Sequence, residues 1–153
     1  MLEIERQCSS AAHWSEEQYK ELFRINESEP RRFALVLDAL AEGSKLSLEP
    51  ASSRTHGFLV ARHLPPDWEL ENLVVAPGFR RKGLATQLLA ALLTRAHETN
   101  SESVFLEVRE SNQAARSLYA QHGFEENGRR RLYYANPTED AVLYRLDLFR
   151  PSA

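Results

Sequence analysis

The sequence has little of several features that define whole classes of proteins. Cys8 is the single cysteine among 153 residues, so no internal disulfide can form and a disulfide-built secreted scaffold is excluded. The 6 Gly and 7 Pro are too few for a collagen-like or low-complexity chain. No apolar run approaches the roughly 20 residues that span a bilayer. Residues 1–7 alternate acidic and apolar side chains, unlike a signal segment, so a cytoplasmic location is expected.

The sequence also lacks a strong charge of one sign. Lys and Arg number 19 against 22 Asp and Glu, which gives a net charge of -3. Such a chain has no global attraction to nucleic acid or to an anionic membrane, so neither is expected as a direct partner. Any anion site must therefore be local. The basic run from Arg129 to Arg131 is interpreted as a solvated strand edge.

A metal centre is not expected either. The chain has 5 His and 1 Cys. The histidines show no paired spacing of the kind that metal ligands require. We therefore predict that the protein works without a structural or catalytic metal.

What remains is the composition of a globular domain. Hydrophobic residues make up 42% of the chain and charged residues 27%. At this length roughly two thirds of the unfolded surface can be buried on folding, which is enough for one stable core. The chain is expected to form a single domain over residues 1–153.

The order of the expected elements indicates a mixed sheet covered by helices. A capping box from Ser15 to Gln18, with Trp14 stapled onto Tyr19, predicts a helix to about Glu27. A leucine stripe after Gly83 predicts a helix that ends near Asn100, and Asn112 is expected to cap a short helix that ends at Gly123. Strands are predicted over 33–40, 57–63, 68–75, 104–108, 124–132 and 141–148, with an irregular connection over 49–56. The fold class is therefore α/β, in the sense of an α+β mixed sheet.

A basic turn with small residues leads into the leucine-rich helix. It contains Arg80, Arg81, Lys82, Gly83, Leu84 and Ala85. Backbone N–H groups at a helix start attract phosphate, and small residues let a pyrophosphate approach the backbone. The alternative is an ordinary basic loop, because loops with one glycine are common and the dinucleotide and P-loop glycine patterns are absent.

The same turn begins a series of motifs that resembles a known family. Arg-x-x-Gly-x-Ala at residues 80–85, after Val-Ala-Pro at 75–77, resembles the acyl-CoA pyrophosphate motif of the GNAT superfamily of N-acyltransferases. The later motifs are similar to the RimI type, the ribosomal-protein-alanine N-acetyltransferases. They are Leu106–Arg109, Ser111 and Asn112, Leu118 and Tyr119, Gly123 and Phe124, Arg131, Tyr133 and Tyr134, and Glu139–Ala141.

The resemblance implies a fold, a cofactor and a reaction. The fold is a central, mostly antiparallel mixed sheet flanked by helices, and the cofactor is acetyl-CoA. The reaction is acetyl transfer to a primary amine, with the N-terminal α-amine of a protein, such as a ribosomal protein, as the first expectation. The implied catalytic pair is Glu107 as base and Tyr119 as acid. The implied cofactor contacts are Leu73, Val74, Val75, Arg80, Arg81, Lys82, Gly83, Leu84, Ala85, Thr86 and Asn112, and the implied substrate contacts are Trp14, Tyr133 and Tyr134.

These roles have alternatives in the residues themselves. Glu107 on an alternating strand can simply face solvent, although its apolar neighbours could also raise its affinity for protons. Tyr119 can be an ordinary core tyrosine. Glu69 and Glu71 alternate with Leu70 and Asn72, so both can point to one face of the strand that enters the site. Because the resemblance also implies that other branches of the family use a glutamate there, Glu69 remains a competing base.

The chain also departs from the resemblance at its beginning. The match to the family's first helix starts almost at Met1, so the first strand is expected to be missing or replaced, and His13 stands where a proline is usual. Acetylation of a small amine or of lysine, and a noncatalytic acyl-CoA-binding module, therefore remain alternatives. The assembly is expected to be a monomer or a homodimer.

Overall fold

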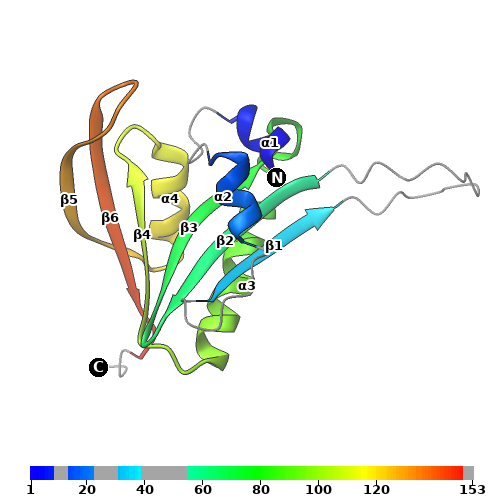
Figure 1. Cartoon of the computed structure of the whole chain (residues 1–153). Helices are drawn as coiled ribbons and strands as arrows, with labels where there is room; N and C mark the ends of the chain where they lie inside the picture. Colours follow the sequence, from blue (N-terminus) through cyan, green and yellow to red (C-terminus); the bar gives the residue numbers. More distant parts are fainter. Residues whose placement is uncertain (9–13, 23–30, 39–54, 150–153) are drawn as a thin grey trace, which may run out of the picture.

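The computed structural model describes residues 1–8, 14–22, 31–38 and 55–149. Six strands form one sheet in the order β1-β2-β3-β4-β6-β5 (Figure 1). All neighbouring strands are antiparallel except β3 and β4, which are parallel. The expected mixed, mostly antiparallel sheet is therefore confirmed. The strands are β1 (Arg32–Asp38), β2 (Thr55–Leu64), β3 (Asp67–Val75), β4 (Ser103–Arg109), β5 (Glu125–Tyr134) and β6 (Glu139–Asp147).

Helices cover both faces of the sheet. The short helices α1 (Leu2–Arg6) and α2 (Glu16–Glu21) lie on one face, and α3 (Leu84–Glu98) lies on the other (Figure 1). The helix α4 (Gln113–Gln121) places its Tyr119 in the same core cluster as α3. A second cluster joins α1 and α2 to β2 and β3. No helix in the described residues is long and apolar enough to cross a membrane.

The predicted start of α2 is confirmed in detail. The Ser15 hydroxyl accepts a hydrogen bond from the Gln18 amide at 3.2 Å, and the Gln18 side chain accepts one from the Ser15 amide at 2.8 Å. The rings of Trp14 and Tyr19 are 5.5 Å apart, as a hydrophobic staple requires. The helix ends at Glu21, short of the expected Glu27, and residues 23–30 lie outside the described residues.

The leucine stripe of α3 packs on the sheet as predicted. Leu88, Leu89, Leu92 and Ala96 are all buried, and Leu93 packs against the same cluster. Each fully buried leucine contributes about 1.5–3 kcal/mol through the hydrophobic effect. This helix therefore anchors the loop that precedes it.

Three local expectations need correction. Thr55 and His56 belong to β2 and not to an irregular connection, because Thr55 pairs with Asp38 of β1; residues 49–54 and 39–40 lie outside the described residues. The strand predicted over 124–132 runs on to Tyr134, and its partner begins two residues earlier than expected, at Glu139. A separate helix over Leu2–Arg6 was not predicted.

A bulge in β3 changes which way its side chains face. Leu70 pairs with Ala61 but Asn72 pairs with Val60, so Glu71 is the extra residue. Before the bulge Leu70 packs in the α3 cluster, whereas after it Val74 packs in the α1–α2 cluster. Simple alternation along the strand therefore fails at this point.

Candidate active site

Strands β3 and β4 separate halfway along their length. They pair only from Asp67 to Leu70 and from Ser103 to Leu106, although β3 continues to Val75 and β4 to Arg109. A cavity of about 400 Å³ lies at this separation, with walls from β1, β3, β4, α2, α4 and the end of β5. The predicted residues that line it are Trp14, Glu69, Leu73, Glu107, Asn112, Tyr119, Tyr133 and Tyr134.

Glu107 projects into this cavity from β4. Its neighbours Leu106 and Val108 are buried, as the apolar strand predicts, and its own side chain is 21% exposed. One carboxylate oxygen lies 3.0 Å from the guanidinium of Arg130. Because Arg130 is half-exposed on the edge strand β5, this partner can move aside more easily than a buried one.

The competing carboxylates on β3 are held more tightly. Glu69 makes an ion pair of 2.5 Å with Arg62. Glu71 accepts two hydrogen bonds from Arg32, at 2.9 and 3.2 Å, and lies 3.5 Å from Arg62. Both glutamates contact Arg62, so they lie on the same side of the strand despite the bulge. Such paired carboxylates are less available for proton transfer.

Tyr119 reaches the cavity from α4. Its ring packs against Phe124 and Tyr144 at centroid distances of 5.7 and 6.2 Å. Burial raises the pKa of the Tyr119 hydroxyl well above its ordinary value, so it keeps its proton at neutral pH. The structure shows no hydrogen-bond partner for this hydroxyl among the described residues.

Aromatic side chains form the remaining walls. The guanidinium of Arg109 lies 4.3 Å from the centre of the Tyr134 ring. Burial and the nearby charge of Glu107 raise the pKa of Tyr134 to about 12. Tyr133 is half-exposed, and its ring is 5.1 Å from that of Tyr134. Trp14 lies just before α2, and the centre of its ring is 5.7 Å from the guanidinium of Arg32.

The loop between β3 and α3 has the backbone geometry of an anion site. Gly83 has a φ of 78° and Arg81 a φ of 62°, and no side chain caps the first turn of α3. A Cβ atom on Gly83 would meet nothing within 4 Å, so the approach to this backbone is open. These features fit a pyrophosphate, which backbone N–H groups and a helix start attract.

The side chains of this loop make contacts of their own. Arg80 donates to the carbonyl of Val75 at 3.3 Å and to the sulfur of Cys8 at 3.2 Å. Lys82 lies 5.1 Å from the ring of Phe79. Residues 80–86 do not line the cavity, but they follow directly from β3, which forms one of its walls.

Asn112 joins the cavity to the start of α4. Its side chain accepts a hydrogen bond from the Ala115 amide at 3.2 Å, which confirms the predicted cap. Its place in the cavity lining leaves it as a predicted cofactor contact.

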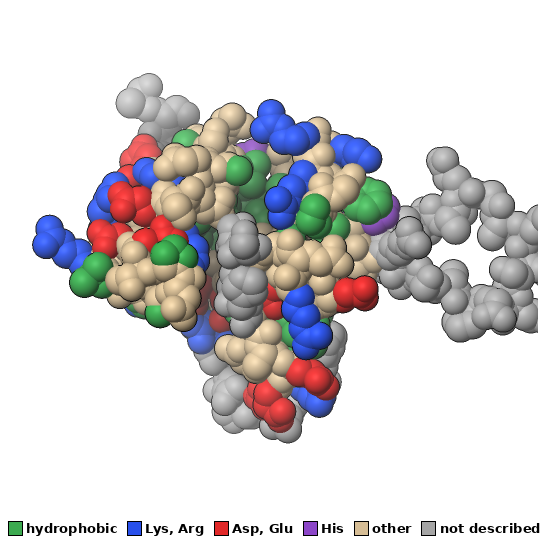
Figure 2. All heavy atoms as spheres, turned by 90° about the horizontal axis from the view of Figure 1, so that it is seen from above, with side chains coloured by type: hydrophobic (Ala, Val, Ile, Leu, Met, Phe, Trp, Pro, Cys, Tyr) green, Lys and Arg blue, Asp and Glu red, His purple; other side chains and the backbone are tan. Residues whose placement is uncertain are grey.

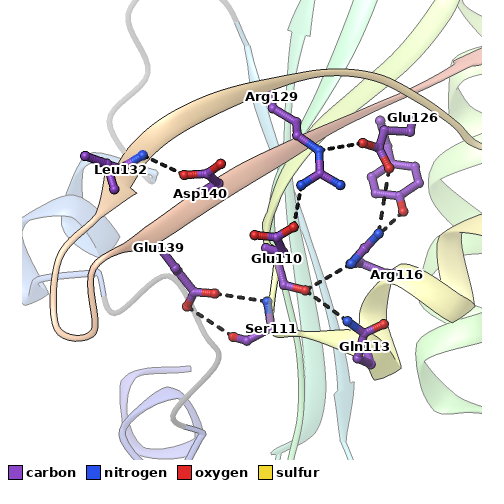
Figure 3. A network of polar contacts seen from close by, with 10 residues as sticks. Glu110, Ser111, Gln113, Arg116, Glu126, Arg129, Leu132, Glu139 and Asp140 are labelled. Carbon is purple, nitrogen blue, oxygen red and sulfur yellow. Dashed lines mark hydrogen bonds and ion pairs between the residues drawn. The ribbon is translucent and has the colours of Figure 1, made fainter.

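Polar contacts that no sequence motif indicates hold the site together. Glu139 accepts a hydrogen bond from Arg109 at 2.8 Å. It also accepts hydrogen bonds from the amide and hydroxyl of Ser111 at 2.9 and 3.1 Å (Figure 3). These donors, with Arg109 first, hold the pKa of Glu139 below its ordinary value. Acidic and basic side chains are mixed on the β5–β6 side of the molecule (Figure 2). The only sign of this role in the sequence is that Glu139 belongs to the last of the family motifs, Glu139–Ala141.

The described part of the chain contains no group of three or more His, Cys, Asp or Glu that could hold a metal ion. The expectation of a metal-free enzyme stays a prediction.

Comparison with known proteins identifies the family. The model of the acetyltransferase (GNAT) family matches residues 1–124. The ribosomal protein bS18-alanine N-acetyltransferase of Salmonella typhimurium is 36% identical over 100 residues, which cover 64% of this chain and 68% of the relative. The N-alpha-acetyltransferase RimI of Mycobacterium tuberculosis is 37% identical over 93 residues, 61% of this chain and 57% of the relative.

A solved structure agrees over nearly the whole chain. The ribosomal-protein-S18-alanine N-acetyltransferase of Escherichia coli has a TM-score of 0.75 and 26% identity, and the match covers 99% of this chain and 87% of that one. The resemblance in the motifs is therefore confirmed. The chain belongs to the GNAT acetyltransferase family and is an acetyl-CoA-dependent N-acetyltransferase.

Proposed function

We propose that this enzyme acetylates the N-terminal α-amine of a protein, with Glu107 as the base and Tyr119 as the acid. The observation that carries the proposal is one cavity that contains both a carboxylate from β4 and a protonated tyrosine from α4. Relatives named for acetylation of the alanine of ribosomal protein bS18 support a ribosomal protein as the nominal partner.

Acetyl-CoA supplies an acetyl group activated as a thioester. Past Leu70 the backbone of β3 has no pairing with β4, so Leu73 and Val74 have backbone groups to offer to the amides of its pantetheine arm. The carbonyl of Val75, the third expected contact on this strand, already accepts a hydrogen bond from Arg80. Residues 80–86 would hold its pyrophosphate through backbone N–H groups and the start of α3, and Asn112 lies at the cavity. The expected contacts of residues 73–75 and 80–86 thus follow one continuous path along β3 and its loop, and Asn112 adds one from the start of α4.

The two catalytic residues divide the proton transfers between them. Glu107 accepts the proton of the acceptor ammonium, which frees the nitrogen lone pair to form the C–N bond. As the C–S bond breaks, Tyr119 donates its proton to the departing sulfur. The second proton, which the nitrogen loses as the amide forms, restores the Tyr119 hydroxyl. Glu69 is the less suitable base because its ion pair with Arg62 is shorter than that of Glu107 with Arg130, and Arg62 is the more buried of the two partners.

An α-amine suits a single carboxylate base better than a lysine does. A peptide α-amine has a pKa of about 7.7–8, so about a tenth is already neutral at pH 7. A lysine amine near 10.4 starts roughly 3.5 kcal/mol worse. The aromatic walls of Trp14, Tyr133 and Tyr134 would contact the first residues of the acceptor.

The test measures thiol release from acetyl-CoA with a panel of acceptors. The panel contains peptides that begin with Ala, Ser or Met, an N-terminally blocked peptide with one lysine, and spermidine. We expect the highest kcat/KM for a peptide with a free α-amine. A preference for spermidine or for the blocked peptide would contradict the proposal. If the protein binds acetyl-CoA but releases no thiol with any acceptor of the panel, it is a noncatalytic module.

A further inference from the structure

The first two residues of β6 hold two parts of the site at once. Glu139 binds the turn that follows β4, and the Asp140 side chain accepts a hydrogen bond from the Leu132 amide of β5 at 2.8 Å (Figure 3). The Asp140 carbonyl accepts another from the Glu110 amide at 3.1 Å. The hairpin of β5 and β6 is thereby tied to the β4–α4 turn.

We propose that Glu139 is a positioning residue that holds Arg109 over Tyr134 and so sets the acceptor side of the cavity relative to Glu107. This inference rests on the proposed function. Glu139 does not line the cavity, whereas Arg109 and Tyr134 do. It therefore acts through its neighbours and does not touch the reacting groups.

Arg109 is the first of these neighbours. It donates to Glu139 at 2.8 Å, and it reaches the carbonyls of Ala135 and Pro137 in the hairpin turn at 3.4 Å each. The side chains of Arg109 and Glu139 are only 16% and 13% exposed, so water screens the pair weakly. With both its charge and its plane fixed, the guanidinium can stack on the Tyr134 ring at 4.3 Å.

Ser111 is the second neighbour. Both its amide and its hydroxyl donate to Glu139, and the next residue, Asn112, caps the helix that carries Tyr119. One carboxylate thus links the β4–α4 turn to the wall formed by Tyr134. Without it, Arg109 keeps only its two longer contacts with the hairpin carbonyls and is more easily drawn toward Glu107, a carboxylate of the same cavity.

Loss of this carboxylate should weaken acceptor binding more than cofactor binding. For Glu139→Gln we expect the KM of a decapeptide that begins with Ala to rise about tenfold, the size of a lost charged hydrogen bond. The KM of acetyl-CoA should stay within about twofold, because the hydrogen bonds of Glu139 go to Arg109 and Ser111 and reach neither residues 73–86 nor the side chain of Asn112, which the Ala115 amide holds. The matched control is Glu98→Gln, which removes a glutamate paired with Arg95 on α3 and should change neither constant.

A double-mutant cycle tests whether Glu139 acts through Arg109. Arg109→Lys keeps the charge but loses the flat guanidinium, so its KM for the decapeptide should rise similarly. The double variant should be no worse than the more impaired single variant. Additive effects would overturn the inference, as would a Glu139→Gln enzyme that melts at a lower temperature but keeps the wild-type KM for the decapeptide.

Ser111→Ala keeps the inference testable if Glu139→Gln does not fold. This change removes one hydrogen bond to Glu139 and should raise the KM of the decapeptide by a smaller factor, with the KM of acetyl-CoA unchanged. An unchanged KM for the decapeptide would overturn the inference. A wild-type enzyme that acetylates no peptide α-amine would instead contradict the proposed function.

Discussion

The hydroxyl of Tyr119 is the group of the site whose protonation state is best defined. It is buried and protonated at neutral pH, and its ring is fixed by Phe124 and Tyr144. We expect Tyr119→Phe to lower kcat about 10²-fold or more, because loss of a general acid has effects of that size. Steady-state kinetics with acetyl-CoA and an Ala peptide measures this.

Tyr144 provides the matched control for this prediction. It is buried beside Tyr119, but its hydroxyl contacts Arg116 and it does not line the cavity. Tyr144→Phe should keep kcat near the wild-type value. An equal loss in both variants would assign Tyr119 a packing role instead of a catalytic one.

The raised pKa of Tyr134 predicts how the stability of the protein changes at alkaline pH. Its pKa is about 12 in the folded protein, against about 10 in an unfolded chain. Because folding favours the protonated form, this contribution to the free energy of unfolding is complete below pH 10 and is lost as the pH rises toward 12. The melting temperature of Tyr134→Phe should therefore fall less steeply than that of the wild type from pH 10 to 12. Parallel curves would contradict this assignment.

For single residues, the sequence predicted which side chains line the site but not which side chains they pair with. Glu107 and Tyr119 were assigned by their motif, and both line the cavity. The pairing of Glu107 with Arg130, and of Glu69 with Arg62, was not predicted. These pairs depend on strand register and side-chain rotamers, which no local pattern encodes.

Among the secondary-structure elements, the turn before α3 allows a direct test, because its backbone conformation depends on Gly83. Gly83 has a positive φ of 78°, which an alanine adopts only with strain. Gly83→Ala should lower the free energy of unfolding by about 1–2 kcal/mol and weaken acetyl-CoA binding, as measured by denaturant unfolding and calorimetry.

Gly78, in the same loop, is the control for this change. A Cβ atom there meets nothing within 4 Å, and its φ lies outside the positive range. Gly78→Ala should leave both stability and acetyl-CoA affinity nearly unchanged. If the two variants behave alike, the geometry of the turn does not serve the cofactor.

Elements with strong local signals were predicted well, and elements set by tertiary contacts were not. The capping box of α2 and the leucine stripe of α3 are encoded within one or two turns of helix. The bulge at Glu71 and the extension of β5 to Tyr134 depend on pairing with another strand. Helix α1 is only five residues long, too short for a periodic pattern to be distinctive.

At the scale of the whole molecule, β2 joins the two cores. Leu59 packs in the α3 cluster, and its neighbour Val60 packs in the α1–α2 cluster. We therefore expect one cooperative unfolding transition, as the single-domain prediction requires. Leu59→Ala should lower the free energy of unfolding by about 2–5 kcal/mol.

Two spectroscopic probes measure this cooperativity. Near-ultraviolet circular dichroism reports on tertiary packing and far-ultraviolet circular dichroism on secondary structure, and for both the wild type and Leu59→Ala their transitions should coincide. Separate transitions would show that the two faces unfold independently. The strand order itself, with β6 between β4 and β5, was accessible from the sequence only through the family resemblance.

In the proposed mechanism Glu107, and not Glu69, accepts the proton of the acceptor amine. The most direct measurement compares kcat for Glu107→Gln and Glu69→Gln, with acetyl-CoA and an Ala peptide at saturating concentrations. The proposed mechanism predicts a loss of about 10²-fold or more for Glu107→Gln and a much smaller effect for Glu69→Gln. Near wild-type turnover in Glu107→Gln, together with loss of turnover in Glu69→Gln, would contradict it.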